Sequence, residues 1–253
     1  LFSRVYDNDA GFDVDERRPM YGHAFSMMFL AQVLGGEESL ERQEEIRAAL
    51  RQAVDLTIRA QSDRGGWYYY PRTQSDEGTL TVTMMQGLRA CKDAGIHVPR
   101  EVIEQGIRYI EASVNPDGGV RYRSTRTNAV REGVTCASVV ALWSAGRYEN
   151  DPLLRKIRDY MDRNIRAQWN AYEEDHGTYI QFYLSQARFL LGGSRWRDYY
   201  RTESRLLVGD QEANGSWLTL EERSRHGVGE VYSTSIALIV LQLPYNRLPV
   251  FQR

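Results

Sequence analysis

The sequence predicts an all-α protein in which a barrel of inner helices is ringed by outer helices. Three observations lead to this fold class. Segments that are apolar on nearly every side alternate with amphipathic segments of helical period. Three of the four loops that lead from amphipathic to apolar segments share a glycine-rich signature, which the loop at 169–178 lacks in its full form. Strand-like runs are short and confined to these loops, so a sheet is not expected.

The chain divides into an irregular lead-in over residues 1–21 and a helical domain over residues 22–253. Residues 22–34 are apolar on most sides, as in a buried helix, and a Gly-Gly pair ends them. Residues 40–60 place apolar side chains at helical spacing with charges between them, which predicts a helix with one solvated face. The apolar positions of this second helix are Leu40, Ile46, Leu50, Val54 and Ile58.

The same alternation continues along the chain. Pro99 and Pro152 stand near the starts of two outer helices, a position that proline tolerates, and Pro244 ends the last inner helix. We therefore predict five inner and four outer helices in all. The further inner helices are expected at 79–94, 134–146, 178–193 and 231–243, and the further outer ones at 99–113, 151–168 and 196–211.

The connecting loops repeat a pattern that indicates a helical repeat array. They read GGW at 65–67, PDGGV at 116–120 and NGSW at 214–217. Self-similar units of roughly 40–60 residues are typical of such arrays. One unit cannot bury its apolar helix alone, so neighbouring units must stack. Helices that are apolar all round also need a second layer outside them, which favours a ringed barrel over an open solenoid.

Composition excludes several classes of protein. The formal net charge is only -2 and no Lys/Arg block stands apart from acids, so nucleic acid and anionic membranes are poor default partners. No apolar run approaches the roughly 18 residues that span a bilayer. Cys91 and Cys136 lie on apolar stretches without a CxxC partner, which indicates buried free thiols. We find no phosphate loop, nucleophile elbow or dinucleotide fingerprint, and we expect no cofactor.

Two of the loops carry a resemblance to a known family. Q-x-x-x-G-G-W at 61–67 and Q-x-x-x-G-S-W at 211–217 resemble the Q-W repeat of triterpene cyclases. With the alternating helices, the chain is similar to the squalene–hopene cyclase and protein prenyltransferase superfamily, and to bacterial prenyltransferase/squalene oxidase repeat proteins. The resemblance covers about residues 22–253 and implies an α/α toroid, here incomplete or small. It also implies an isoprenoid that is bound or cyclised in an aromatic-lined central cavity.

The acidic motif of the family is only partly present. Class II cyclases carry Asp-x-Asp-Asp before an inner helix, and the nearest match here is Gln-Ser-Asp-Glu at 74–77. The resemblance places Asp76 at the position of the proton donor, with Glu77 beside it. A general acid must be a carboxylic acid kept neutral, which a desolvated pair can provide. The alternative is that both acids only cap the following helix, where carboxylates are favoured.

Further candidate residues lie on or near the inner helices. The tryptophans Trp67 and Trp217 are expected to lock neighbouring units by packing. Aromatic side chains that could wall a pocket and stabilise carbocations are Tyr69, Tyr70, Trp143, Phe182, Tyr183 and Tyr232. Polar candidates near the same ends of inner helices are His23, His176 and Glu230.

A metal site is not predicted. His23 and His176 could join Asp175 or Glu77, but their spacing matches no recognised ligand pattern. The zinc site of protein prenyltransferases needs Asp-x-Cys, and neither cysteine has an aspartate two residues before it.

Two other functions stay open at this point. One is a non-catalytic toroid that binds a ligand or a protein partner on its rim. The other is a carbohydrate-active α/α barrel, which would use two carboxylates such as Asp76 and Glu230.

Overall fold

The computed structural model describes residues 18–71, 74–125, 130–166, 168–169, 177–218 and 229–246. These residues form helices and three isolated β-bridges, with no strand among them. The inner helices are α1 (Pro19–Gly36), α3 (Gly78–Asp93), α5 (Glu132–Ser144), α7 (Gly177–Leu191) and α10 (Glu230–Gln242). The outer helices are α2 (Leu40–Ala60), α4 (Arg100–Ser113), α6 (Pro152–Asn164) and α8 (Gly193–Gly209), and a short 3₁₀ turn, η2 (Leu243–Tyr245), follows α10.

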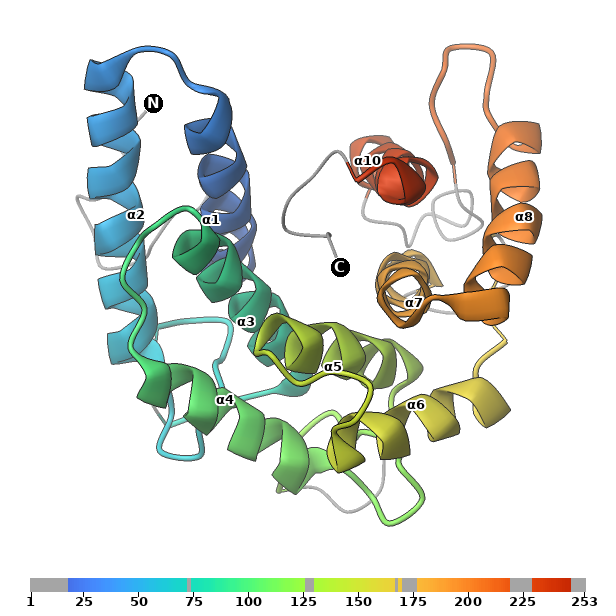
Figure 1. The fold of residues 1–253 in the computed structure, drawn as a ribbon, viewed down its shortest axis with the longest axis horizontal. Coiled ribbons are helices and arrows are strands. Elements are labelled where there is room, and N and C mark those ends of the chain that lie inside the picture. Colours follow the sequence, from blue (N-terminus) through green and yellow to red (C-terminus); the bar gives the residue numbers. More distant parts are fainter. Residues whose placement is uncertain are drawn as a thin grey trace.

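The helices follow one another around an arc (Figure 1). The inner helices pack in the order α1, α3, α5, α7 and α10, and the outer helices lie along the outside of the arc. Among the described residues, the arc is open between the limb of α1 and α2 and the limb of α8 and α10 (Figure 1). The prediction of an all-α toroid with inner and outer helices is confirmed, and the described helices form an incomplete ring.

Burial follows the sequence pattern in both layers. In α5 every residue from Gly133 to Leu142 is buried, because this helix lies between α3, α6 and α7. In α6 only Leu154, Ile157 and Met161 are buried, which are spaced to lie on one face of a helix. Both cysteines are buried free thiols, as predicted. No described helix is long and apolar enough to cross a membrane.

The element ends differ from the predicted ones by a few residues. Helix α1 begins at Pro19, inside the predicted lead-in, because proline is well suited to the first turn of a helix. Helix α6 begins at Pro152 as expected, where the side chain of Asp151 accepts hydrogen bonds from two backbone N–H groups. It ends at Asn164 rather than at 168. Residues 1–17 of the lead-in lie outside the described part of the chain.

The two tryptophan loops join α2 to α3 and α8 to α10. Trp67 Nε1 donates to the carbonyl of Thr57 in α2 at 2.8 Å, and its backbone N–H donates to Thr81 Oγ1 in α3 at 3.1 Å. Trp217 repeats this geometry. It donates to Leu207 O in α8 at 2.7 Å and to Thr234 Oγ1 in α10 at 3.0 Å. Both tryptophans are buried, so they fix neighbouring units as expected.

Glutamine and glycine shape these loops. Gln61 Nε2 donates to the carbonyl of Gly65, and Gln211 Nε2 donates to that of Gly215, both at 2.9 Å. Gly65 and Gly215 have φ of 89°, which side-chain-bearing residues rarely adopt. A Cβ added at Gly65 would also lie 2.2 Å from the carbonyl oxygen of Gln105 in α4. The loop therefore requires glycine at this position.

Candidate active site

A buried glutamate lies at the start of α3. Glu77 is the residue before the helix, and its carboxylate accepts the backbone N–H groups of Thr79 at 2.7 Å and Leu80 at 2.6 Å. The hydroxyl of Thr79 also donates to this carboxylate, and the Tyr21 hydroxyl does so at 3.3 Å. Burial raises the pKa of Glu77, and these hydrogen bonds offset part of that effect. The surroundings of Glu77 thus favour its neutral form more than those of an ordinary glutamate.

Three further tyrosines lie near Glu77: Tyr21 of α1, and Tyr69 and Tyr122 of two loops. The Tyr21 hydroxyl donates to Thr79 Oγ1 at 2.5 Å, and the ring of Tyr21 lies 6.0 Å from that of Tyr69. The hydroxyls of Tyr69 and Tyr122 are hydrogen-bonded to each other. Burial, followed by the nearby charge of Glu77, raises the pKa of Tyr21 and of Tyr122, so both phenols stay protonated.

Helix α7 supplies the other side of this group. Tyr183 shares a hydrogen bond of 2.8 Å with Thr83 Oγ1 of α3, and its ring lies 4.8 Å from that of Tyr179, edge to face. A Cβ at Gly133 would lie 2.6 Å from the Tyr179 ring, so glycine at this position gives the ring its space. Burial raises the pKa of Tyr179, with smaller effects from Glu77 and Tyr232. We call this group the tyrosine cluster: Tyr21, Tyr69, Tyr122, Tyr179 and Tyr183 around Glu77.

Asp76 has a different environment from its neighbour. Its carboxylate accepts a hydrogen bond from Ser62 Oγ at 2.9 Å and forms an ion pair with Arg64 at 2.7 Å. The Asp76 side chain is 1% exposed, whereas that of Arg64 is 48% exposed. Both partners belong to the loop at 61–67, so Asp76 ties this loop to the start of α3. A proton donor must instead hold its proton until the substrate arrives.

His23 lies against the outer helix α2. Its Nε2 lies 3.1 Å from the carbonyl of Ala53 and 3.0 Å from Thr57 Oγ1, both in α2. The imidazole is therefore buried between an inner and an outer helix. Burial lowers the pKa of His23 to about 4, so it is neutral near pH 7.

The remaining predicted residues are spread over the inner helices. Phe182 is buried and lies 6.3 Å from Phe25 of α1, ring to ring. Tyr232 is half-buried in the first turn of α10. Tyr70 is 38% exposed. Trp143 lies in the last turn of α5, at the opposite end from the cluster, where its ring is 5.1 Å from that of Tyr148.

Glu230 and His176 complete the predicted set. Glu230 is exposed at the start of α10 and accepts a hydrogen bond from Asn214 Nδ2 at 3.1 Å. Hydrogen bonds from Ser216 and Asn214 lower its pKa, which suits a carboxylate in the first turn of a helix. His176 and Asp175 lie outside the described residues. Within the described part of the chain, no three His, Cys, Asp or Glu side chains are placed to hold a metal ion.

Sequence reasoning missed three members of the cluster: Tyr21, Tyr122 and Tyr179. A signal existed for one of them, because Tyr179 and Tyr183 are four residues apart at the start of an inner helix and so share a face. Tyr122 lies in a loop, where spacing predicts no direction. Tyr21 stood in the expected lead-in.

Comparison with known proteins supports the fold. No protein-family model matches the sequence, and neither does any curated protein. Among solved structures, a protein from Actinoplanes matches with a TM-score of 0.61 at 18% identity over 88% of this chain. A type II terpene cyclase from Scytonema, solved with its substrate geranylgeranyl dihydroxybenzoate, matches with a TM-score of 0.60 at 16% identity over 90% of this chain. This chain spans 64% of the length of each of these two neighbours. It therefore has a terpenoid cyclase-like all-α fold.

Proposed function

We propose that this protein binds an isoprenoid chain against its inner helices and starts its cyclisation by protonation, with Glu77 as the proton source. One observation carries the proposal. Glu77 is a buried carboxyl whose pKa burial raises, and it lies among tyrosines that come from α1, α7 and two loops. The fold is shared with a type II terpene cyclase whose substrate, geranylgeranyl dihydroxybenzoate, carries a geranylgeranyl group, and this suggests the class of substrate.

The chemistry follows from this environment. Protonating an alkene needs a neutral carboxylic acid, and burial favours that form of Glu77. The Thr79 hydroxyl contacts both Glu77 and Tyr21, so it can pass a proton between them. Protonation leaves a carbocation on the chain, and the faces of aromatic rings stabilise such a cation. Phe182, Tyr183, Tyr69 and Tyr232 are the proposed walls of this site.

A second candidate is a toroid that binds the same kind of ligand without catalysis. The specific observation in its favour is that both oxygens of Glu77 accept backbone N–H groups, so helix capping alone accounts for its position. The ion pair of Asp76 with Arg64 also favours a structural role for this acid over a catalytic one. The carbohydrate-active alternative lacks such support, because Glu230 is exposed with a lowered pKa, whereas an acid catalyst needs a raised one.

Binding is tested first, by thermal unfolding with farnesol, geranylgeraniol and squalene, and with hexadecanol as a saturated control. A ligand at 100 times its Kd stabilises the folded state by about 2.7 kcal/mol, which raises the melting temperature. We expect a rise with at least one isoprenoid and a smaller one with hexadecanol. The absence of any rise with the three isoprenoids would refute both candidates.

Catalysis is tested next with paired variants. Glu77→Gln removes the proton but keeps one acceptor for the helix, and it should lower turnover by about 100-fold or more. Asp76→Asn should keep turnover if the protein remains folded, and Tyr70→Phe, an exposed tyrosine outside the cluster, serves as the control. Full turnover in Glu77→Gln, or its loss only in Asp76→Asn, would contradict the role of Glu77. Binding without any product would select the non-catalytic candidate.

A further inference from the structure

A second site lies far from the tyrosine cluster, at the other end of α7. A cavity of about 220 Å³ opens between α6, the end of α7 and the start of α8. Its lining residues are Arg158, Asp159, Asp162, Arg188, Leu191, Gly192 and Arg195. None of these residues belongs to the tyrosine cluster, and Arg188 lies five residues beyond Tyr183 on α7, or about 7.5 Å along a helix axis, so this cavity is distinct from the proposed active site.

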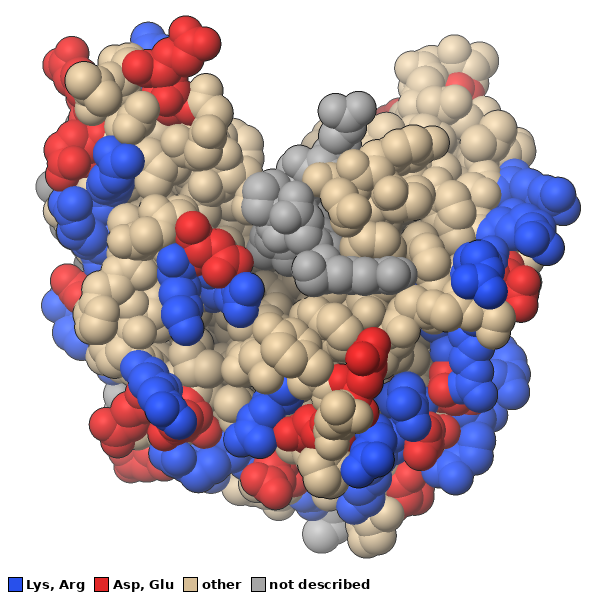
Figure 2. All heavy atoms as spheres, viewed as in Figure 1, with Lys and Arg blue, Asp and Glu red and all other residues tan. Residues whose placement is uncertain are grey.

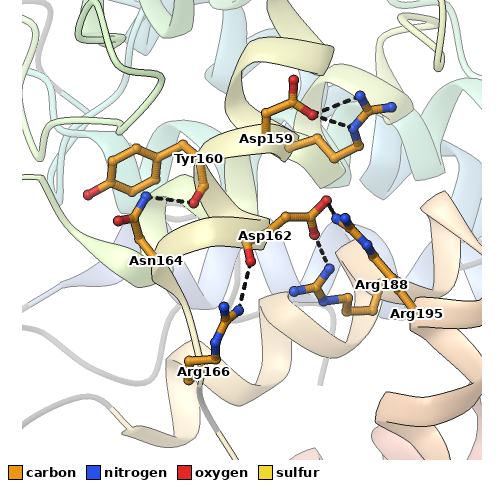
Figure 3. Close-up of polar contacts among 8 residues, drawn as sticks. Asp159, Tyr160, Asp162, Asn164, Arg166, Arg188 and Arg195 are labelled. Carbon is orange, nitrogen blue, oxygen red and sulfur yellow. Dashed lines mark hydrogen bonds and ion pairs between the residues drawn. The ribbon is translucent and has the colours of Figure 1, made fainter.

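Positive charge is in excess at this cavity. One carboxylate, that of Asp162, pairs with two guanidinium groups, those of Arg188 and Arg195 (Figure 3). The side chains of Asp162 and Arg188 are only 9% and 11% exposed, so water screens this pair weakly, whereas the side chain of Arg195 is 63% exposed. The third arginine, Arg158, pairs with the exposed Asp159 at 2.8 Å. Three cations therefore face two carboxylates around one hollow.

The helices around the cavity, α6 and α8, also carry more positive than negative charges. Helices α6 and α8 together carry eight Arg and Lys residues and four acids. Helices α2 and α4 together carry six Arg residues and seven acids. One of the four acids is Glu203, which is buried and has its pKa raised to about 8, so it is mostly neutral at pH 7. In Figure 2 blue side chains are frequent at the right and lower right of the molecule, over α8 and α6, with red side chains among them. The field of this face draws anions toward the cavity.

We propose that this arginine-lined cavity binds a phosphate group. Guanidinium groups offer paired N–H donors that match phosphate oxygens, and Arg195 can turn toward a ligand because its side chain is 63% exposed. Asp162 neutralises only one of the two positive charges of Arg188 and Arg195, and a bound phosphate would compensate the other. The phosphate belongs either to a soluble molecule or to a lipid headgroup, and the experiment separates these two sources.

The test titrates the full chain with inorganic phosphate by calorimetry, at constant ionic strength set with chloride. Arg195→Gln is compared with Arg205→Gln, which removes the same charge from an exposed position elsewhere on α8. We expect Arg195→Gln to weaken binding about tenfold or more and Arg205→Gln to leave it nearly unchanged. In parallel, all three proteins are sedimented with phosphatidylcholine vesicles that contain phosphatidic acid, and with vesicles that lack it.

Each outcome decides the proposal. Selective loss in Arg195→Gln with inorganic phosphate supports it with a soluble source, and the same selective loss with phosphatidic acid vesicles supports it with a lipid headgroup. Equal weakening in the two variants would overturn it, because diffuse surface charge then explains the binding. Lack of binding to both probes by the wild-type protein would overturn it as well. Circular dichroism of each variant verifies that it is folded.

Discussion

The buried imidazole of His23 gives a sharp prediction for the pH dependence of stability. Its Nε2 lies against Ala53 and Thr57 of α2, where burial lowers the pKa from 6.5 to about 4. Above pH 6.5 the residue is neutral in both the folded and the unfolded state, so its full contribution to stability is present. As the pH falls toward 4, the unfolded state takes up a proton that the folded state resists, and stability is lost.

The magnitude follows from the size of this pKa shift. Each unit corresponds to about 1.36 kcal/mol, and the shift is about 2.5 units when the values 6.5 and about 4 are compared. Linkage then gives a loss of about 2 kcal/mol by pH 5 and about 3 kcal/mol by pH 4, relative to pH 7. Losses of this size are a large part of the stability of an ordinary domain.

The assay is urea unfolding of the wild-type protein, His23→Gln and His97→Gln between pH 4.5 and 7. His97 is exposed, so its variant controls for histidine removal in general. Carboxylates that titrate in this range are common to all three proteins and cancel in the differences. The stability advantage of the wild-type protein over His23→Gln should shrink by about 2 kcal/mol as the pH falls. A constant advantage across the range would refute the buried, neutral imidazole.

Three other predictions concern the loops and the buried acid of α8. Trp67→Phe should cost about 1–3 kcal/mol in urea unfolding, because the carbonyl of Thr57 in the last turn of α2 loses its donor; an unchanged midpoint would contradict this role. Gly66→Ala should destabilise the protein more than Gly106→Ala in thermal unfolding. A Cβ at Gly66 would meet Asp76, Tyr109 and Thr81 within 2.9 Å, whereas a Cβ at Gly106 would meet the flexible end of Met85. The reverse order would be evidence against this packing. Glu203, whose Oε1 accepts from Gln181 at 2.7 Å, has its pKa raised from 4.5 to about 8, so its stabilising effect is present below pH 4.5 and lost as the pH rises through 8. Relative to the wild-type protein, Glu203→Gln should therefore gain about 3 kcal/mol between pH 5 and pH 8, and a pH-independent difference would disprove the shift.

The layers of the fold could be predicted from sequence because each inner helix is apolar all round and each outer helix is not. The same property hides which way a side chain on an inner helix points. His23 was expected near a cavity, but a helix buried on every side gives no period that separates its cavity face from the face toward α2. Only the packed structure shows that it contacts Ala53 and Thr57.

The sequence singled out Asp76 and Glu77 as candidates, but it could not predict their different surroundings. Asp76 and Glu77 are adjacent, and their different roles depend on Arg64 and Ser62 on one side and on Tyr21 on the other. None of these partners is close in sequence to the acids they contact, so local patterns carry no information about the pairing. The contacts that separate a proton donor from an anchor belong to the assembled site.

The most direct test of the account is product analysis in D₂O with the isoprenoid that binds best. Glu77 exchanges its proton with solvent between turnovers, so protonation by this carboxyl should place one deuterium on the cyclised product, which mass spectrometry detects. Glu77→Gln should yield at least about 100-fold less product under the same conditions. A cyclised product without deuterium, or equal product formation by Glu77→Gln, would contradict proton transfer from Glu77.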